Sequence, residues 1–470
     1  MADTIVALAT PTGRSGIGVI RLSGDRSLEI TRKLVDDSGF APEPRTAHLK
    51  QLHDPLSGDV IDEAIITYFK APHSFTGEDV VEISCHGSPV LLRQVIDICL
   101  AHDARMADAG EFSLRALANG RMNLAEAEAI RDLIDAQTTA SARQAIRQLR
   151  GEFSNQLQPL KDNLLNVIVV LESALEFVED DLPAVQAENV KQKLAAVAAE
   201  TGKLAATFQA GRLIREGLRV ALVGRPNVGK SSLFNALLGS DRAIVTELAG
   251  TTRDQIHERF TIGDIPISLI DTAGLRETTD TVESIGVERS RATIADADIV
   301  IVMLDASEPV TAEDLEIIAS VRGIQYIVAI NKIDKVQSGE IEKVKFQISN
   351  FKFQNSDLGI EKSDFKSQIV ELSAKTGDGL DALKKAIVEP FSPQDIASSG
   401  FLVTDARHHD LLIRAGNDIK QSLEQFNQKM SEEIVLIGLH NALRYLGQIT
   451  GETTTEDMLT RIFSTFCIGK

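Results

Sequence analysis

A glycine-rich octapeptide near the middle of the chain, Gly224 to Ser231, limits the possible folds more than any other segment. It reads G-x-x-x-x-G-K-S; the apolar run Leu218 to Val223 precedes it, and Ser232 to Leu238 follows with helical spacing. A strand, a glycine loop and a helix in this order predict a phosphate-binding loop, because its backbone N–H groups and the helix N-terminus face phosphate oxygens. We expect Lys230 to reach the β- and γ-phosphates and the Ser231 hydroxyl to bind Mg²⁺.

Two further motifs end predicted strands. Asp271-Thr272-Ala273-Gly274 follows the run Ile265 to Ile270, and its carboxylate can hold Mg²⁺ through water while Gly274 offers an N–H to a γ-phosphate. Asn331-Lys332-Ile333-Asp334 follows the run Tyr326 to Ile330. The N-K-x-D pattern suits guanine, since Asp334 can accept hydrogen bonds from N1–H and the exocyclic amine together.

Two shorter segments complete the set. Ser373-Ala374-Lys375 follows the short run Ile369 to Leu372 and is expected to lie behind the base. Gly250-Thr251-Thr252-Arg253-Asp254 lies between the first two motifs, where a threonine hydroxyl can complete the Mg²⁺ shell. The order of these segments resembles that of translation-factor-related GTPases, which implies binding and hydrolysis of GTP.

One position departs from small signalling GTPases, which carry a glutamine after D-T-A-G to orient the attacking water. Leu275 stands there and forms no side-chain hydrogen bond. Hydrolysis is therefore slow, or another group acts, and spacing leaves Glu277, Glu283 and Glu288 open as candidates or as solvated helix charges. The side-chain carbonyl of Asn227 can also ligate a monovalent cation beside the β- and γ-phosphates.

Composition indicates a soluble cytoplasmic enzyme. The chain has 470 residues, enough for about three domains, and a net charge of −19, which argues against broad nonspecific binding of nucleic acid. No apolar run approaches the ~20 residues that a membrane span needs, and the acidic N-terminus does not resemble a signal peptide. The three cysteines, Cys85, Cys99 and Cys467, indicate neither a disulfide framework nor a zinc site.

Patterning along the chain predicts three domains. Residues 1–118 alternate short strand-like and helical runs, as in a compact α+β domain. Residues 119–215 and 389–470 are mainly helical and predict one discontinuous domain, into which a GTPase domain with a mostly parallel sheet, residues 216–388, is inserted. Within it, residues 337–366 are polar and are interpreted as an enlarged surface insertion before the last strand.

The C-terminus ends in Phe466-Cys467-Ile468-Gly469-Lys470. A cysteine at the fourth position from the end is reminiscent of a prenylation box, but the terminal Gly-Lys and the absence of a polybasic segment do not fit it. A structural thiol on an apolar helix end and a thiol carried to an active site on a flexible tail both stay open.

The flanking segments resemble a specific family, the tRNA modification GTPases called MnmE or TrmE. The resemblance rests on Thr4 to Ala7 with Pro11-x-Gly13-Arg14-x-Gly16, on Phe75-Thr76-Gly77-Glu78-Asp79-Val80-Val81-Glu82 with Cys85-His86-Gly87, and on Gly110-Glu111-Phe112-Ser113-x-Arg115-Ala116. The G-T-T-R-D loop and the Cys-Ile-Gly-Lys ending add to it. It covers essentially the whole chain.

The resemblance implies a GTPase that acts with an FAD-dependent partner protein on tRNA. Together they add a carboxymethylaminomethyl or aminomethyl group to C5 of the wobble uridine, with 5-formyltetrahydrofolate or methylenetetrahydrofolate as the one-carbon donor. It also implies a homodimer that forms through a folate-binding-like N-terminal domain, and a heterotetramer with the partner. The G domain is expected to be Ras-like, and K⁺ is expected to promote docking of the G domains of the two subunits.

The resemblance also implies roles for individual residues. Asn227, Thr246, Leu248 and Thr251 match the K⁺ site, Ser231 and Thr252 match the Mg²⁺ ligands, and Glu283 matches the carboxylate that acts on water. Arg21, Glu78, Arg121 and Lys470 match folate-contacting positions, and Cys467 matches a tail cysteine with a tentative catalytic role. The residues expected at GTP are Asn227, Val228, Gly229, Lys230, Ser231, Ser232, Thr246, Glu247, Leu248, Ala249, Gly250, Thr251, Thr252, Asp271, Thr272, Ala273, Gly274, Asn331, Lys332, Asp334, Ser373, Ala374 and Lys375.

Two departures from the family pattern concern the folate site. Lysine is common in the family where Arg121 stands, which keeps the charge but changes the geometry, and tyrosine is common where Phe75 stands. Two other functions stay open at this point. One is a ribosome-assembly or RNA-chaperone GTPase without modification chemistry, and the other is a plain GTPase switch that binds no folate.

Overall fold

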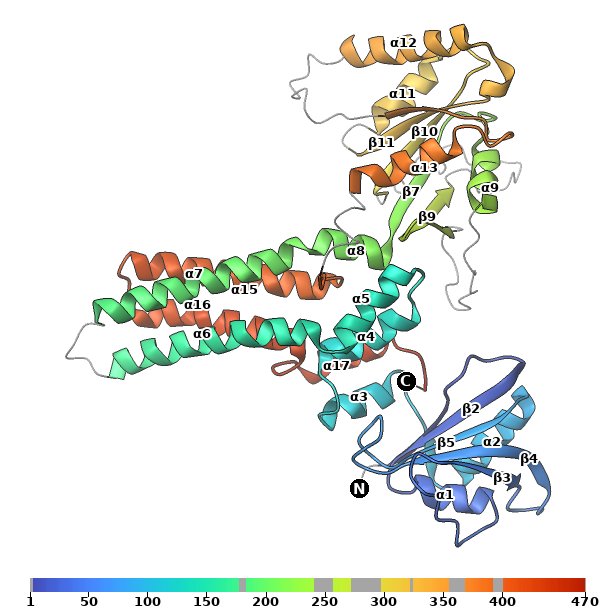
Figure 1. The fold of residues 1–470 in the computed structure, drawn as a ribbon, viewed down its shortest axis with the longest axis vertical. Coiled ribbons are helices and arrows are strands. Elements are labelled where there is room, and N and C mark those ends of the chain that lie inside the picture. Colours follow the sequence, from blue (N-terminus) through green and yellow to red (C-terminus); the bar gives the residue numbers. More distant parts are fainter. Residues whose placement is uncertain are drawn as a thin grey trace. The chain divides into compact units, whose positions relative to one another are not determined.

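The computed structural model describes residues 3–176, 183–240, 257–271, 297–321, 324–354, 368–391 and 400–469 (Figure 1). The chain forms two compact units, the first made of Met1–Asp135, Ala145–Gly202 and Asp410–Lys470, and the second of Ala136–Gln144 and Lys203–His409. Among the described helices, none is both long and apolar enough to cross a membrane. The finer three-domain division, with boundaries at 118, 215 and 388, stays a prediction.

The first unit begins with a six-stranded mixed sheet. Its order is β3-β4-β5-β2-β1-β6, in which β1 pairs antiparallel with β2 and parallel with β6. The strands are β1 (Thr4–Leu8), β2 (Ser15–Ser23), β3 (Ala47–His53), β4 (Val60–Phe69), β5 (Val80–Gly87) and β6 (Ala104–Met106). The short strands predicted within residues 1–118 are thereby confirmed.

Alternation along these strands gives the sheet two different faces. One face, with Ile20, Ile66 and Ile83, packs into a buried core with helices α1 (Ser27–Leu34) and α2 (Pro89–Ala101). The opposite face carries exposed apolar side chains on the adjacent strands β3 and β4 and on β2, which β5 separates from them. These are Ile17 on β2, Leu49 on β3 and Ile65 on β4.

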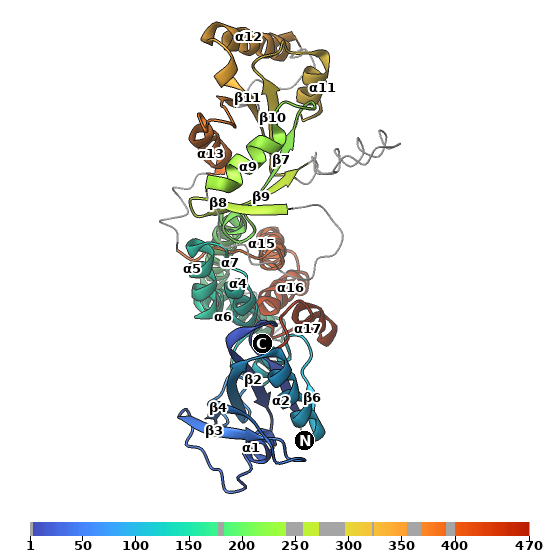
Figure 2. The ribbon, with the colours of Figure 1, turned by 90° about the vertical axis from the view of Figure 1, so that its right-hand side faces the viewer.

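The rest of the first unit is helical. Figure 1 shows α6 and α16 side by side, and Figure 2 views α15 and α16 nearly end on. The capping box formed by Asn123 and Glu126 starts α4, because each side chain satisfies the other's backbone N–H. The helices are α3 (Glu111–Ala118), α4 (Leu124–Ile134), α5 (Thr139–Leu149), α6 (Glu152–Glu176), α7 (Ala184–Ala206), α15 (Ala406–Asn427), α16 (Glu432–Thr450) and α17 (Glu456–Phe463).

The second unit holds a sheet in the order β12-β11-β10-β7-β9-β8, all parallel except the β8–β9 pair. The mostly parallel sheet predicted for the GTPase domain is therefore confirmed. Strand β10 is buried along its whole length, as expected for a strand covered on both faces. The strands are β7 (Leu218–Val223), β8 (His257–Ile262), β9 (Ile265–Asp271), β10 (Ile299–Asp305), β11 (Tyr326–Asn331) and β12 (Gln368–Glu371).

Helices cover both faces of this sheet. On one face, α8 (Phe208–Glu216), α9 (Lys230–Ser240) and α13 (Leu380–Val388) bury Leu213, Leu233 and Leu383 in a common core. On the other face lie α11 (Ala312–Ser320) and α12 (Ser338–Gln354). Two short 3₁₀ helices, Ile333–Lys335 and Glu389–Phe391, follow β11 and α13.

Helix α12 was not predicted from the sequence. The segment 337–366 was interpreted as an enlarged surface insertion before the last strand, and residues 338–354 of it form a helix. Ile341, Val344 and Ile348 are buried against the sheet, at the spacing of one helix face. The polar residues between them hide this periodicity in the sequence. The remainder of the segment, 355–367, lies outside the described residues.

Within the second unit, α8 leads directly into β7 and contacts the returning segment 400–409. The backbone N–H of Val403 donates to Oγ1 of Thr207 at 3.0 Å. A Cβ at Gly211 would lie 2.1 Å from the carbonyl oxygen of Val403, so only glycine permits this approach. Arg215 pairs with Asp405, with Nη1 and Oδ2 at 2.6 Å. The two chain segments that enter and leave the sheet region are thereby joined to each other.

Candidate nucleotide-binding site

The P-loop between β7 and α9 has the backbone of a phosphate-binding loop. Gly224, Asn227 and Gly229 all have positive φ angles, of 153°, 64° and 102°. A Cβ at Gly224 would lie 2.6 Å from the carbonyl oxygen of Met303, and one at Gly229 would lie 2.3 Å from Nδ2 of Asn331. Both positions therefore require glycine, and successive backbone N–H groups of such a loop form an anion-binding concavity.

Lys230 begins α9 and turns back over the loop. Its Nζ donates to the carbonyl oxygens of Gly224 at 2.7 Å and Arg225 at 2.8 Å. Ser231 and Ser232 follow in the first turn of the helix and are exposed. The ammonium group and a hydroxyl thus lie at the helix N-terminus, where phosphate oxygens and their metal ion are expected.

The guanine-binding loop is joined to the P-loop by Asn331 at the end of β11. This buried amide donates from Nδ2 to the carbonyl oxygen of Val228 at 2.8 Å and accepts from the backbone N–H of Ala374 at 3.0 Å. Asp334 accepts from Oγ of Ser373 at 2.7 Å. The Ser373 hydrogen bond holds the pKa of Asp334 below its usual value. Contact of this carboxylate with guanine stays a prediction.

Lys332 forms a second link between the same loops. Its Nζ donates to the carbonyl oxygen of Asn227 at 2.8 Å and pairs with Oδ2 of Asp305 at 2.5 Å. Burial alone would raise the pKa of Asp305, but hydrogen bonds from Lys332 and Ser307 outweigh burial and lower it. The sequence reasoning missed Asp305, although a carboxylate at the end of an apolar strand was a signal for it.

The structure therefore brings together the P-loop, the N-K-x-D loop and the Ser373–Lys375 loop. Lys375 is exposed, and its charge contributes to lowering the pKa of Asp334. Asp271 ends β9, paired in register with Leu222 of β7. The predicted residues Thr246–Thr252, Thr272–Gly274, Glu283 and Lys470 lie outside the described residues.

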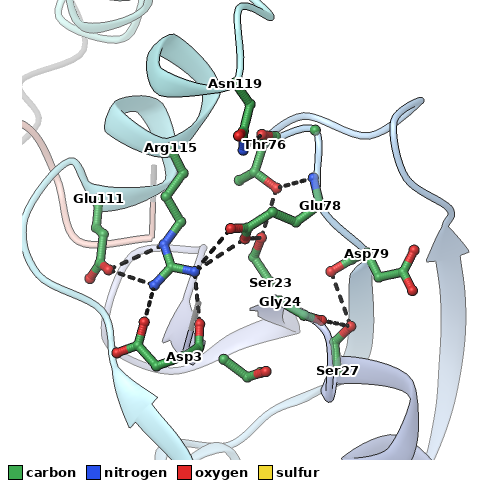
Figure 3. Close-up of polar contacts among 12 residues, drawn as sticks. Asp3, Ser23, Gly24, Ser27, Thr76, Glu78, Asp79, Glu111, Arg115 and Asn119 are labelled. Carbon is green, nitrogen blue, oxygen red and sulfur yellow. Dashed lines mark hydrogen bonds and ion pairs between the residues drawn. The ribbon is translucent and has the colours of Figure 1, made fainter. Parts of the chain in front are cut away.

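A second cluster of charged groups lies in the N-terminal domain. Figure 3 shows Arg115 of α3 pointing toward Glu78, with Nη1 3.2 Å from both carboxylate oxygens. Arg115 also pairs with Asp3 at 2.7 Å and Glu111 at 2.9 Å. Burial would lower the pKa of Arg115, but Glu111, Glu78 and Asp3 outweigh burial and raise it. Ser23 donates to Oε2 of Glu78 at 2.7 Å.

The other predicted folate residues lie nearby on separate elements. Arg21 donates through Nε and Nη2 to Glu82 at 2.9 and 2.7 Å, and through Nη1 to the carbonyl oxygen of Gly469 at 3.1 Å. Arg121 is exposed, and its Nε donates to the carbonyl oxygen of Ser74 at 3.2 Å. The roles of Arg115 and Glu82 were not assigned from the sequence, although both stand within its signature segments.

Cys467 is exposed on the C-terminal tail. Its carbonyl oxygen accepts from the N–H of Gly110 at 3.4 Å, and Ile468 forms a β-bridge with Ala109. Phe466 is buried against α4. The tail therefore runs back to the N-terminal sheet with its thiol outward, and the structural and catalytic readings of the thiol both stay predictions.

The fold and the site define a P-loop GTPase that also carries an N-terminal α+β part and a helical part. Two family models match the chain, one described as the MnmE helical domain over residues 124–467 and the other as the GTP-binding protein TrmE N-terminus over residues 4–121. The tRNA modification GTPase MnmE of Aquifex aeolicus is 42% identical over 471 residues, covering 100% of both chains. The protein of that name from Koribacter versatilis is 43% identical over 471 residues, covering 100% of this chain and 99% of its own.

The chain therefore belongs to the MnmE family of tRNA modification GTPases. Among solved structures, Era of Aquifex aeolicus bound to GDP·AlF4⁻ is 29% identical and covers 43% of this chain and 66% of its own. Its TM-score of 0.29 is too low to support an argument about this chain.

Proposed function

We propose that this chain hydrolyses GTP with K⁺ stimulation and couples hydrolysis to modification of tRNA. With an FAD-dependent partner it adds a carboxymethylaminomethyl or aminomethyl group to C5 of the wobble uridine. The GTPase identity and the tRNA in this proposal derive from family membership. The chemistry of the added group, the partner and the cation derive from the resemblance of its motifs.

The observation that best supports the proposal is the hydrogen-bonded link between the guanine-binding loop and the P-loop. Asn331 ties the N-K-x-D loop to Val228 of the P-loop, and Ser373 orients Asp334 for guanine. Binding of the base and binding of the phosphates therefore depend on one connected set of hydrogen bonds. GTP binding shifts the population toward one arrangement, and release of phosphate returns it.

Two cations are proposed at the phosphates. Oxygen ligands suit both ions, and the described part of each set fits: Ser231 carries a hydroxyl in the first turn of α9, and Asn227 carries an amide oxygen on an exposed loop. The Mg²⁺ set is Ser231 and Thr252, and the K⁺ set is Asn227, Thr246, Leu248 and Thr251. Bound ions neutralise charge that develops on the phosphates, and Glu283 is proposed to act on the attacking water in place of a glutamine.

The test is GTP turnover in KCl and in NaCl, with Asn227→Ala and Glu283→Ala alongside. We expect turnover to fall when Na⁺ replaces K⁺, and to fall with either substitution while GTP still binds. Turnover that is indifferent to the salt and to both substitutions would contradict the cation site and the assignment of Glu283. Leu275→Gln is a useful companion, since it restores the glutamine of signalling GTPases at that position.

Folate is proposed as the one-carbon donor, bound near Arg21, Glu78, Arg121 and Lys470. Glu78 supplies a carboxylate for the donor groups of a pterin, and arginines suit the carboxylates of folate. In the structure Arg115 and Ser23 hold the Glu78 carboxylate in one orientation. Calorimetry with 5-formyltetrahydrofolate should show binding that Glu78→Gln weakens by about tenfold, the cost of one charge-assisted hydrogen bond. Equal affinity of the wild-type protein and of Glu78→Gln for 5-formyltetrahydrofolate would contradict this site.

A homodimer through the N-terminal domain is proposed on the open face of its sheet. Leu49 and Ile17 are each 63% exposed there and Ile65 is 45% exposed, and such a patch is typical of an interaction surface. Leu49→Asp should reduce the mass measured by light scattering from dimer to monomer. Arg93→Asp, on the exposed side of α2, is the matched control that should leave the mass unchanged.

We propose that the protein acts on tRNA in the cytoplasm. It does so as a heterotetramer with the FAD-dependent partner. Nucleoside analysis of tRNA from a deletion strain should show loss of the modified wobble uridine. Intact modification together with a ribosome-assembly defect would instead favour a GTPase without modification chemistry. Cys467→Ser in the same assay reports whether the tail thiol takes part in the reaction.

A further inference from the structure

The P-loop needs support from its neighbours. A non-glycine residue in the left-handed region, such as Asn227, costs about 1–3 kcal/mol and persists where the surroundings over-determine it. Asn331 and Lys332 hold the carbonyl oxygens of Val228 and Asn227. A third contact comes from a side chain of the loop itself, that of Arg225.

Arg225 does not point into solvent, as a P-loop side chain can, but pairs with two carboxylates. Its Nε donates to Oδ1 of Asp314 at 2.7 Å, and its Nη2 donates to Oε2 of Glu308 at 3.3 Å. The Arg225 side chain is 15% exposed, that of Asp314 is 1% exposed and that of Glu308 is 56% exposed. The pair with Asp314 is therefore shielded from water, and the pair with Glu308 is not.

Asp314 is itself held rigidly at the start of α11. Its Oδ2 accepts from the backbone N–H and from Oγ1 of Thr311, both at 2.9 Å, as part of a capping box. This leaves Oδ1 for Arg225. Both oxygens accept hydrogen bonds and the side chain is buried, so the carboxylate is held in one orientation. Because Arg225 donates to this carboxylate, the Arg225 side chain is held in place as well. The same contact raises the pKa of Arg225.

Asp305 repeats this arrangement at the other end of the connection between β10 and α11. Its Oδ1 accepts from the backbone N–H of Ser307 at 2.9 Å and from Oγ of Ser307 at 2.6 Å. Its Oδ2 pairs with Lys332 of the guanine-binding loop. Each aspartate therefore uses one oxygen to fix itself in the turn or cap and the other to hold a cation from a nucleotide-binding loop.

We propose that Asp305 and Asp314 are positioning residues for the guanine nucleotide, and that the connection between them is a common anchor for the P-loop and the guanine-binding loop. Asp314 fixes the P-loop through Arg225, and Asp305 fixes the base loop through Lys332. Neither aspartate needs to touch the nucleotide. They keep the two loops in the relative arrangement that binding requires, so the nucleotide does not have to order them.

The test uses Arg225→Gln in the full-length protein, with release of fluorescent N-methylanthraniloyl GDP and GTP as the readout. Loss of one buried, charge-assisted hydrogen bond should speed release about tenfold. Because positioning affects both nucleotides alike, the factor should be the same for GDP and GTP. The GTP KM should rise by that factor, with kcat at saturating GTP unchanged. Glu308→Gln, which removes only the exposed partner, should leave release within about twofold of wild type.

A double-mutant cycle separates positioning from simple loss of stability. If Arg225 acts through Asp314, Arg225→Gln combined with Asp314→Asn should release nucleotide no faster than either single variant by more than about twofold. Asn123→Ala, which removes the capping box of α4 far from the nucleotide-binding loops in the sequence, should lower the thermal stability but leave nucleotide release nearly unchanged. Asp305→Asn, which keeps an acceptor for Ser307, is an independent variant that should also speed release of both nucleotides.

Three results would overturn the proposal. A change in GTP release alone would mean that Arg225 contacts the γ-phosphate directly. Unchanged nucleotide release in both Arg225→Gln and Asp305→Asn would mean that the two ion pairs do not position the nucleotide-binding loops. Additive effects in the cycle would mean that Asp314 does not act through Arg225.

Discussion

The pair between Arg215 of α8 and Asp405 offers a sharp test of how the two segments that flank the predicted GTPase domain are held to each other. Its side chains are 20% and 14% exposed, with Nη1 and Oδ2 at 2.6 Å. Burial would raise the pKa of Asp405, but His408, Arg215 and the N–H of Arg407 outweigh burial and hold it well below the usual value. The carboxylate is therefore charged in the fold and depends on its partners. Arg215→Gln removes the partner that forms the ion pair with Asp405.

The magnitude follows from the burial of the pair. Removing one member of a buried ion pair costs about 3–5 kcal/mol, because the remaining charge stays desolvated. Both side chains here keep some contact with water, so we expect the lower end, about 3 kcal/mol. At 1.4 kcal/mol for each factor of ten, this corresponds to about 150-fold in the local opening equilibrium.

Hydrogen–deuterium exchange measured by mass spectrometry reads this equilibrium locally, which matters because a chain of this size does not unfold in two states. Peptides that cover α8 should exchange about 150-fold faster in Arg215→Gln. Arg414→Gln is the matched control: Arg414 and Asp410 pair at 2.9 Å with side chains 58% and 55% exposed. In Arg414→Gln, the exchange rate of peptides that cover Arg414 should change by less than about fivefold. Equal protection of α8 in wild type and Arg215→Gln would refute the reasoning, because the pair would then add nothing to the attachment.

Three more predictions follow from individual contacts. Gly229→Ala should abolish GTP binding in a filter assay while the sheet stays folded by circular dichroism, because the new Cβ would displace Asn331. Asp334→Asn should shift the preference from GTP to XTP in competition binding, since an amide can donate to the extra carbonyl of xanthine. The contribution of Asp405 to stability is fully present above its unfolded pKa of about 3.9 and is lost as pH falls through its lower folded pKa. Exchange of α8 should therefore be pH-independent from 7 to 5, after correction for the intrinsic rate, in ~100 mM salt.

Much of the nucleotide site was readable from the sequence because its signals are local. The strand β7, the P-loop and α9 follow one another directly, and glycine at positions 224 and 229 is required by positive φ angles and close backbone approach. The strand before Asn331 and the guanine-reading Asp334 are equally local. Short strand-like runs in residues 1–118 also predicted strands of the N-terminal sheet.

Local signals were weaker elsewhere. Helix α12 was missed because the apolar positions Ile341, Val344 and Ile348 are separated by charged and polar residues in a segment without a clear start signal. The partners of Glu78 were missed for a different reason. Arg115 was visible as part of a motif, but nothing in its local spacing indicated that α3 would turn it toward the loop before β5.

The sequence by itself determined the phosphate loop and the preference for guanine, since each depends on residues a few positions apart. The mostly parallel sheet was expected from the resemblance of these motifs to those of GTPases. Only the tertiary structure decided which distant charges meet. Arg225 and Asp314 are 89 residues apart, Arg215 and Asp405 are 190 apart, and Arg21 and the carbonyl of Gly469 are 448 apart. Such pairs depend on how whole elements pack, because burial and orientation decide which carboxylate a long, flexible arginine can reach.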